Sequence, residues 1–399
     1  MRKGPRKPVG FAKNRRLRGG DFARGTDARC ALQTKICLYC EKWESGGIES
    51  FLTNVLTHLD LSALSVDLAA AELCPSVFTA RLEALGVRFV QLSGSLRDLK
   101  TNHRMFRELL RERQYDVVHL NAYQAMSLQY LDLAREAGVP VRIAHSHNTA
   151  LRKSATRALK LVLHNRAKEK YADVATDLWA CSQEAAAFLF SDEALRKQGY
   201  TFIPNGIEID RFRFSPEARD RVRAELGLGD ALVIGNIGRL CYQKNQQFLL
   251  QVLPEVLRRR SDAVLLLVGE GDDRAALEEE SRALGISDRV IFYGTTDRPE
   301  DFYSAMDVFA FPSRFEGLGI AAVEAQTAGL QTLCSEHVPH EARLTPLAVP
   351  LPLEAAAWAD AIVHQKQETD RAAAAEAVED AGFAIRAVAE KIESKWKGI

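Results

Sequence analysis

The sequence predicts an α/β protein made of two doubly wound domains, each built on a parallel sheet. Short apolar runs of about four to seven residues alternate with helical stretches of about 10–20 residues, and this rhythm occurs twice. Strands of a parallel sheet are buried on both faces, so they read as continuous apolar runs with helices between them. A chain of 399 residues also exceeds what one hydrophobic core usually serves.

The strands are expected in two sets of five, one in each half of the chain. The first set lies at 35–40, 65–71, 87–92, 116–120 and 141–145. The second set lies at 231–237, 263–268, 289–293, 307–311 and 331–334.

The joint between the domains is expected near 203–215, where Pro204 and Gly206 end an apolar segment before a charged stretch. The last stretch reads as an amphipathic helix with one apolar stripe, formed by Phe383, Ile385, Val388, Ile392 and Trp396. We expect this helix to cross back onto the first domain, and the alternative is that it caps its own domain. The predicted parts are therefore a basic N-terminal extension, a first domain, a second domain and a C-terminal helix, at 1–34, 35–207, 208–378 and 379–399.

Charge is balanced over the whole chain but not along it. The first 35 residues hold eleven Lys and Arg against two Asp, a net charge of +9 that leaves −9 for the remainder. This segment lacks apolar periodicity, so we expect a disordered extension or residues upstream of the true start, with a basic membrane tether as the alternative. The acidic remainder argues against binding to nucleic acid. No run approaches the roughly 18 apolar residues of a membrane-spanning helix.

Seven scattered cysteines indicate buried thiols and not a metal site. Cys37 and Cys40 have a C-x-x-C spacing, but they lie in an apolar strand, where residues three apart point to opposite faces. Free thiols favour the reducing cytosol.

The most specific chemical pattern is FPSRFEGLGIAAVEAQTAG, at 311–329. A strand at 307–311 is followed by a turn made of Gly317, Leu318 and Gly319, and then by a helix from Ile320 to Ala328. Glycines let backbone amides approach a phosphate, and a helix N-terminus adds about half a positive charge there. Two carboxylates bracket this cradle and are suited to accept hydrogen bonds from sugar hydroxyls, namely Glu316 and Glu324.

Two basic residues follow the first strand of the second half. Arg239 and Lys244 lie five residues apart on a loop, and both are expected to reach a departing diphosphate without a metal ion. The alternative is a solvated loop. The nearby pair Gly269 and Gly271 is only a partial dinucleotide fingerprint, since Arg274 occupies the third glycine position.

In the first half, Gly46 and Gly47 form a glycine loop after the first strand. His145 and His147 close the fifth strand, and we expect one of them to line the site beyond the carboxyl ends of the strands. The basic stretch 151–170 has an apolar stripe and is predicted to be an amphipathic helix. It either rests on anionic lipid or guides a lipid-phosphate acceptor, and the alternative is an ordinary helix with a solvated basic face.

With these segments in place, the chain resembles glycosyltransferase family 4, whose GT-B fold consists of two Rossmann-like domains facing a cleft. The resemblance covers roughly 35–397 and rests on SGGIESF, IPNGIEIDRF, GRLCYQKN, LLLVGEGDDR and FPSRFEGLGIAAVEAQTAG, which occur in the family's order. RIAHSHNT, ACSQEAAAFLF and QKNQQFLL are similar to the branch that acts in bacterial capsule and exopolysaccharide assembly.

The resemblance implies that the first domain, 35–207, binds the acceptor and that the second, 208–378, binds the nucleotide-sugar donor. It also implies a role for each candidate residue. Glu316 is expected near the donor sugar, Glu324 on the nucleotide ribose, and Arg239 with Lys244 on the diphosphate. His147, just past its strand, is expected to orient the donor sugar. The substrate-binding backbone is expected from Gly46, Gly47, Gly317, Leu318 and Gly319. Two positions depart from the family pattern: Gly319 stands where proline is often found, and Asn121 stands where a second histidine is common.

The function that follows is retaining, metal-independent sugar transfer from a nucleotide diphosphate sugar, with a UDP-sugar expected first. The acceptor is expected to be lipid-linked or a saccharide, and no cofactor beyond the donor is expected. The protein is expected in the cytoplasm or peripherally on the inner face of the plasma membrane. The alternatives are transfer to a small soluble acceptor and an inactive nucleotide-sugar-binding subunit of an assembly complex. An NAD-dependent dehydrogenase is disfavoured because the complete glycine fingerprint is missing.

Overall fold

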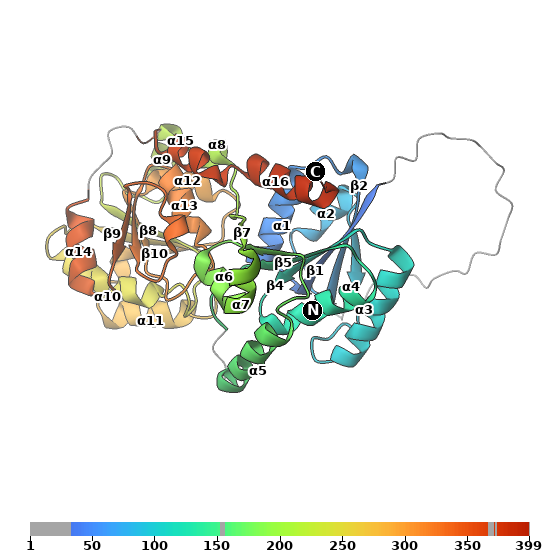
Figure 1. Cartoon of the computed structure of the whole chain (residues 1–399). Coiled ribbons are helices and arrows are strands. Elements are labelled where there is room, and N and C mark those ends of the chain that lie inside the picture. The colour runs from blue at the N-terminus through green and yellow to red at the C-terminus, as the bar shows by residue number, and fades with distance from the viewer. Residues whose placement is uncertain (1–32, 152–155, 366–370, 372, 399) are drawn as a thin grey trace, which may run out of the picture.

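The computed structural model describes residues 33–151, 156–365, 371 and 373–398. The predicted extension at 1–34 lies almost entirely outside these residues, and the first strand already begins at Thr34. Two lobes are seen in Figure 1, one formed by the first half of the chain and one by most of the second half.

The first lobe contains a seven-stranded sheet in the order β3-β2-β1-β4-β5-β6-β7, and all of its strand pairs are parallel. The strands are β1 (Thr34–Trp43), β2 (Leu64–Leu73), β3 (Arg88–Gln91), β4 (Val117–Ala122), β5 (Val141–Ser146), β6 (Asp177–Ala180) and β7 (Thr201–Phe202). The helices around it are α1 (Gly47–Thr57), η1 (Leu61–Ala63), α2 (Thr79–Ala84), α3 (Leu99–Arg113), η2 (Ala125–Leu128), α4 (Gln129–Glu136), α5 (Arg157–Lys170), α6 (Gln183–Leu189) and α7 (Asp192–Gln198).

The second lobe contains a six-stranded parallel sheet in the order β10-β9-β8-β11-β12-β13. Its strands are β8 (Val233–Ile237), β9 (Val264–Val268), β10 (Val290–Gly294), β11 (Val308–Phe311), β12 (Gln331–Ser335) and β13 (Ala348–Leu351). The helices that follow β7 are α8 (Ile209–Phe212), α9 (Pro216–Glu225), α10 (Gln246–Leu257), α11 (Arg274–Ala283), η3 (Ser287–Arg289), α12 (Pro299–Ala305), α13 (Ile320–Thr327), η4 (His340–Ala342), α14 (Ala355–Val363), α15 (Ala373–Val378), η5 (Glu379–Phe383) and α16 (Ile385–Lys397).

These sheets confirm the predicted fold class. Each of the ten predicted strands is present within a few residues of its expected bounds. The additional strands β6, β7 and β13 are only two to four residues long, so they gave no apolar run in the sequence. Cys37 and Cys40 are buried in separate core clusters, as expected for opposite faces of one strand. None of the described helices combines the length and the apolar character that crossing a membrane requires.

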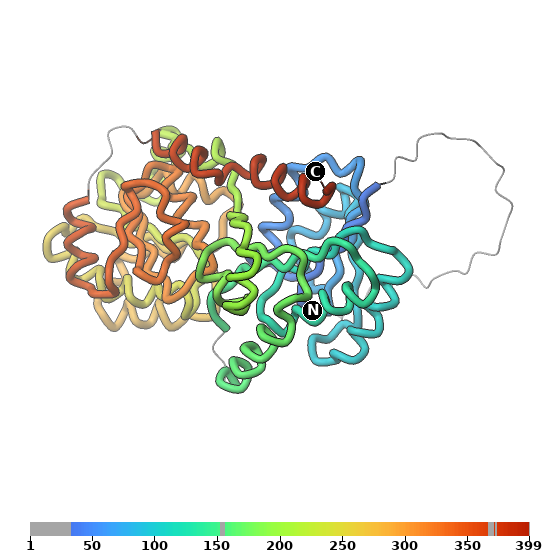
Figure 2. The backbone as a smooth tube through the Cα atoms, viewed as in Figure 1, coloured from blue at the N-terminus to red at the C-terminus, as the bar shows by residue number. Residues whose placement is uncertain are grey.

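The C-terminal helix crosses back onto the first lobe. Its stripe from Ile385 to Trp396 is buried in the same core cluster as α1 and β1. The helix begins later than predicted, because the chain breaks at Gly382, where φ is +83°. Figure 2 shows the red C-terminal tube passing the green linker between the lobes.

The two crossings of the chain are joined by backbone hydrogen bonds. The amide of Ile207 donates to the carbonyl of Phe383 at 2.8 Å, and the amide of Ile385 donates back to Ile207 at 2.9 Å. A Cβ on Gly206 would lie 2.8 Å from the Cα of Ile385, closer than side chains allow. Glycine in the predicted joint is therefore required by the close approach of the C-terminal segment.

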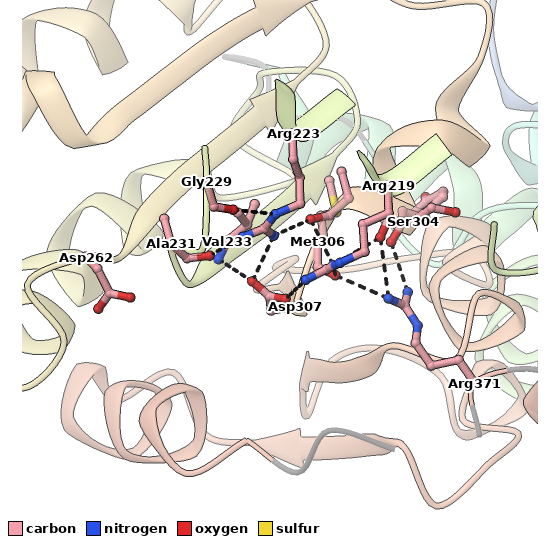
Figure 3. Close-up of polar contacts among 12 residues, drawn as sticks. Arg219, Arg223, Gly229, Ala231, Val233, Asp262, Ser304, Met306, Asp307 and Arg371 are labelled. Carbon is pink, nitrogen blue, oxygen red and sulfur yellow. Dashed lines mark hydrogen bonds and ion pairs between the residues drawn. The ribbon is translucent and has the colours of Figure 1, made fainter. Parts of the chain in front are cut away.

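A cluster of charged residues lies at the amino-terminal edge of the second sheet (Figure 3). The carboxylate of Asp307 accepts hydrogen bonds from Arg219 at 2.6 Å, from Arg223 at 3.3 Å and from the amide of Val233 at 2.8 Å. A cavity of about 710 Å³ lies beside it. Ligands of open α/β sheets bind at the carboxyl ends of the strands, so this cavity lies at the wrong edge for the predicted site.

Candidate functional site

The two domains meet through segments that follow the carboxyl ends of β5, β6 and β11. The hydroxyl of Thr149 donates to the carbonyl of Glu316 at 2.8 Å, and the hydroxyl of Ser182 donates to the carbonyl of Gly317 at 2.6 Å. A Cβ on Gly317 would lie 2.0 Å from the carbonyl oxygen of His147, so only glycine fits there. The structure thus brings the predicted histidine segment against the predicted glycine turn.

The glycine turn leads directly into α13. Gly319 precedes the helix with φ of +95°, a conformation that proline cannot adopt because its ring fixes φ near −65°. The departure from the family's proline therefore fits the backbone of this chain. Leu318 is buried and anchors the turn, while the helix N-terminus that follows carries amides without partners inside the helix.

Lys244 and Glu316 form an ion pair, with 2.7 Å between Nζ and Oε1. The other carboxylate oxygen of Glu316 accepts a hydrogen bond from Gln243 at 3.3 Å. The ammonium also lies 4.7 Å from the ring centroid of Phe311. Two residues predicted for different parts of the donor are therefore in direct contact, and Gln243 joins them although no sequence pattern indicated it.

The loop that carries Lys244 is held by close backbone packing. A Cβ on Gly269 would lie 2.1 Å from the carbonyl oxygen of Gly238, and one on Gly271 would lie 2.1 Å from that of Leu240. The partial dinucleotide fingerprint is thus explained by packing against the loop after β8. At the end of this loop, the side chain of Asn245 donates to the carbonyl of Pro312 at 3.1 Å, which ties it to the segment after β11.

Arg239 lies on the same loop but is not part of the Lys244 cluster. Its side chain is exposed and makes no ion pair or hydrogen bond within the described residues. Only its carbonyl is engaged, by the side chain of Gln246 at 3.1 Å. Its expected contact with a diphosphate stays a prediction.

Glu324 lies on α13, as predicted, and accepts a hydrogen bond from the hydroxyl of Tyr303 at 2.8 Å. Burial raises the pKa of Glu324 to about 7, although the Tyr303 bond and the charges of Arg211 and Lys244 oppose the rise. Tyr303 comes from α12 and was missed, because nothing in the sequence places α12 beside α13.

His147 lies just past the end of β5, and its ring packs inward. Its Nε2 lies 3.0 Å from Oδ1 of Asn121, and its ring centroid lies 5.1 Å from that of Phe51. Burial lowers the pKa of His147 to about 3, so the ring is neutral at pH 7. His145 is fully buried within the strand, with Nδ1 3.2 Å from Nε2 of His119. Asn121, the second departure from the family pattern, is therefore the partner that orients the predicted histidine.

Gly46 and Gly47 form the predicted loop at the start of α1. A Cβ on Gly46 would lie 2.7 Å from Oε2 of Glu49, a buried residue three positions later. Glu49 accepts hydrogen bonds from the amide of Glu44 at 3.2 Å and the hydroxyl of Tyr123 at 3.3 Å, and burial raises its pKa. A glutamate three residues after an N-cap was the available signal for this interaction. Within the described residues, no hydrogen bond joins this loop to the second domain.

One group of three metal-ligating side chains is present in the described part of the chain. Glu184, His340 and Glu341 offer ligand atoms within 4.8 Å of one another, and the first two are exposed. The amide of Gln183 donates to Glu341 at 2.6 Å, so the group lies where α6 meets η4. None of the predicted site residues belongs to it.

Two parallel-sheet domains whose carboxyl-end loops meet beside the Lys244–Glu316 pair have the architecture expected of the GT-B class. Comparison with known proteins agrees. Residues 45–211 match the family model Glycosyltransferase Family 4, and residues 218–344 match Glycosyl transferases group 1.

Individual relatives extend this match. EpsF of Bacillus subtilis, described by its name as a glycosyltransferase, is 32% identical over 306 residues, which cover 73% of this chain and 77% of EpsF. A UDP-Gal:alpha-D-GlcNAc-diphosphoundecaprenol alpha-1,3-galactosyltransferase of Escherichia coli is 26% identical over 60% of this chain and 62% of its own length. Anabaena Alr3699/HepE, solved in complex with UDP, superposes with a TM-score of 0.73 at 20% identity, covering 92% of this chain and 100% of that one.

The chain belongs to glycosyltransferase family 4. It is an enzyme of the hexosyltransferase type that uses a nucleotide sugar, which confirms the predicted family and enzyme class.

Proposed function

We propose that this enzyme transfers a sugar from a UDP-sugar to a lipid-linked saccharide, with retention of configuration and without a metal ion, in bacterial exopolysaccharide or capsule synthesis. The observation that carries the proposal is the Lys244–Glu316 pair, which lies at the start of α13 where the loop carrying His147 meets the second domain. It supplies a cation for a diphosphate and a carboxylate for sugar hydroxyls in one place.

The chemistry follows from these groups. An ammonium has three N–H donors, so Lys244 can keep its bond to Glu316 and still donate to the departing diphosphate. The amides at the start of α13 stabilise the same negative charge. In retaining transfer without a protein base, the leaving phosphate oxygen takes the acceptor proton while the sugar passes through an oxocarbenium-like state. The protein contributes mainly orientation and charge stabilisation.

The nature of the acceptor is supported by relatives. The E. coli relative acts, by its name, on a diphosphoundecaprenol-linked sugar. A Mycolicibacterium smegmatis relative, 32% identical over 50% of this chain and 53% of its own length, is named as a GDP-mannose-dependent phosphatidylinositol monomannoside mannosyltransferase. Both acceptors carry a lipid, so we extend this class of acceptor to the present chain.

We also propose that α5 rests on an anionic membrane. The helix projects from the lower middle of the molecule in Figure 1. Its apolar residues Leu159 and Val162, part of the predicted stripe, are 61% and 48% exposed, and Arg157 and Arg166 are exposed beside them. The predicted stripe also includes Leu151, Ala155 and Ala158, of which Ala155 lies outside the described residues. Exposed apolar side chains next to basic ones favour an interfacial helix.

The test is a binding panel followed by transfer. UDP- and GDP-sugars are titrated against the full chain, and the one that binds is used with lipid-linked acceptors in the presence of EDTA. We expect binding of a UDP-sugar, turnover that resists EDTA, and a product with the anomeric configuration of the donor. A UDP panel that fails to bind, turnover that requires a divalent cation, or inversion would contradict the corresponding part of the proposal.

A further inference from the structure

A second cavity, of about 250 Å³, opens at the carboxyl edge of the first sheet. Its walls come from the ends of β1 and β2 and from the segments that follow β3, β4 and β5. This is the edge at which open α/β sheets bind their ligands. None of the residues predicted for the donor lines it.

Glu41 lies within this cavity and is unusual in its surroundings. Its Oε1 accepts hydrogen bonds from the hydroxyl of Ser127 and from Gln124, the latter at 3.3 Å. Its Oε2 makes no hydrogen bond within the described residues, and no Lys or Arg pairs with it there. Burial raises the pKa of Glu41. Burying a carboxylate without a neighbouring cation costs free energy. Because Oε2 receives no hydrogen bond from the described residues, it is suited to accept one from a ligand hydroxyl.

The mouth of the cavity has a different chemistry. Leu96, Leu99 and Leu163 line it and are 40%, 44% and 41% exposed. Lys160, also exposed, lines the same mouth from α5. One turn before Leu163 lies Leu159, so the apolar lip continues along the outer face of α5. The cavity therefore contains a carboxylate, and its mouth carries a cation together with apolar side chains.

The wall formed by α5 is fixed in place. His164 is buried, with Nδ1 accepting the amide of Ala125 at 3.1 Å and Nε2 2.8 Å from the carbonyl of Phe188. The ring therefore ties α5 to η2, which carries the other wall, and to α6. The cavity is thus a preformed site and not a gap between loosely placed segments.

Two hydrogen bonds and the adjoining stretches of chain connect the cavity with the Lys244–Glu316 pair. Gln124, the partner of Glu41, follows Tyr123, whose carbonyl accepts a hydrogen bond from the side chain of Asn148 at 3.4 Å. The next residue, Thr149, donates to the carbonyl of Glu316. A ligand in the cavity therefore lies on the side of the first domain that meets the donor loop.

We propose that this cavity binds the acceptor, with a sugar hydroxyl on Glu41, the anionic linkage at Lys160 and the lipid chain along Leu163 and Leu159. This rests on the proposed function in taking the acceptor to be lipid-linked, and it adds the site and the residues that select it. Glu41 is the residue that distinguishes a saccharide from a bare lipid phosphate.

The experiment measures acceptor and donor binding separately in the full chain. The probes are undecaprenyl-diphosphate-linked GlcNAc, Glc and Gal in detergent micelles, with undecaprenyl phosphate as the probe that lacks a sugar. We expect Glu41→Gln to weaken binding of the best sugar-bearing probe about tenfold, the loss of one charge-assisted hydrogen bond, with undecaprenyl phosphate and UDP-sugar affinity unchanged. Unchanged donor affinity also shows that the variant is folded.

The contribution of the apolar cavity mouth is tested by substituting two leucines of similar exposure. Leu163 is 41% exposed and Leu284, on the second domain, is 42% exposed. We expect Leu163→Ser to weaken binding of all the lipid probes several-fold and Leu284→Ser to leave it unchanged. Equal effects of the two variants, or an unchanged acceptor affinity in Glu41→Gln, would overturn the inference. So would failure of all three sugar-bearing probes to bind a chain that binds its donor. Failure of every nucleotide sugar to bind would instead contradict the proposed function.

Discussion

Two carboxylates at opposite edges of the second sheet are equally buried but differently surrounded. Asp307, at the amino-terminal edge, and Glu316, at the carboxyl edge, both have side chains that are 6% exposed. Asp307 accepts from two arginines and a backbone amide, whereas Glu316 pairs with one lysine and a glutamine. A buried charge that is fully compensated holds the fold together, and one with fewer partners leaves capacity for a ligand.

The largest expected effect falls on the carboxyl edge. Lys244→Ala removes the cation proposed to stabilise the departing diphosphate, so kcat/KM is expected to fall roughly 100- to 1,000-fold, as on losing one preorganised donor. Steady-state transfer assays measure this. Since the change also leaves Glu316 unpaired, the double variant Lys244→Ala with Glu316→Gln serves as the control for folding. Near-normal transfer by Lys244→Ala would remove the basis of the proposed chemistry.

At the amino-terminal edge, a substitution should reduce the stability of the fold and leave transfer intact. Asp307→Asn leaves Arg219 and the buried Arg223 without their counter-charge, so the free energy of unfolding is expected to fall by about 3–5 kcal/mol. Denaturant unfolding measures the loss, and transfer per folded molecule should be preserved. A variant Asp307→Asn with reduced transfer and an unchanged free energy of unfolding would contradict a purely structural role for the amino-terminal edge.

The sequence predicted this division only in part. Its apolar rhythm located the sheets, and the glycine turn at 317–319 located the carboxyl edge of the second one. The pairing of Lys244 with Glu316 was not predictable, because 72 residues separate them. Each was also expected to contact a different part of the donor. No sequence pattern indicated Glu41. The predicted strand ended at residue 40, whereas β1 continues to Trp43 and includes Glu41.

Tertiary contacts decided the remaining residues. Tyr303 modifies Glu324 only because α12 packs beside α13, and Asn121 orients His147 only because β4 and β5 are neighbours. Such pairs join separate elements, so no local pattern records them. Local chemistry, such as the helix start at Gly319, was by contrast readable from the sequence itself.

A smaller effect is expected from pH at the carboxyl edge. With a pKa of about 7, Glu324 takes up a proton as pH falls below neutrality and loses the charge proposed to accept the ribose hydroxyls. The dissociation constant for the nucleotide sugar should therefore rise up to tenfold per pH unit below 7. Titration calorimetry between pH 5.5 and about 8 measures this dependence.

Two variants sharpen the pH prediction. Glu324→Gln should flatten the profile, because no titrating group remains at that position. Tyr303→Phe removes the hydrogen bond that opposes the rise in pKa, so the midpoint should move to higher pH. In the unliganded protein the sign is reversed: because the folded state holds this proton more tightly than the unfolded state, stability should fall as pH rises from about 4.5 to 7. An unchanged midpoint in Tyr303→Phe would assign the pH dependence to another group.

The smallest effect on stability is expected at Arg239, which belongs to neither of the two charge clusters. Its side chain is exposed and without partners in the described structure, so Arg239→Ala should change the free energy of unfolding by less than about 0.5 kcal/mol. If the arginine closes onto the diphosphate when the donor binds, donor affinity should still fall about tenfold, and the loss should be smaller in high salt because an exposed charge is screened. Arg258→Ala, another exposed arginine of the second domain, is the control. An unchanged donor affinity in Arg239→Ala would leave Lys244 and the start of α13 as the groups that hold the diphosphate.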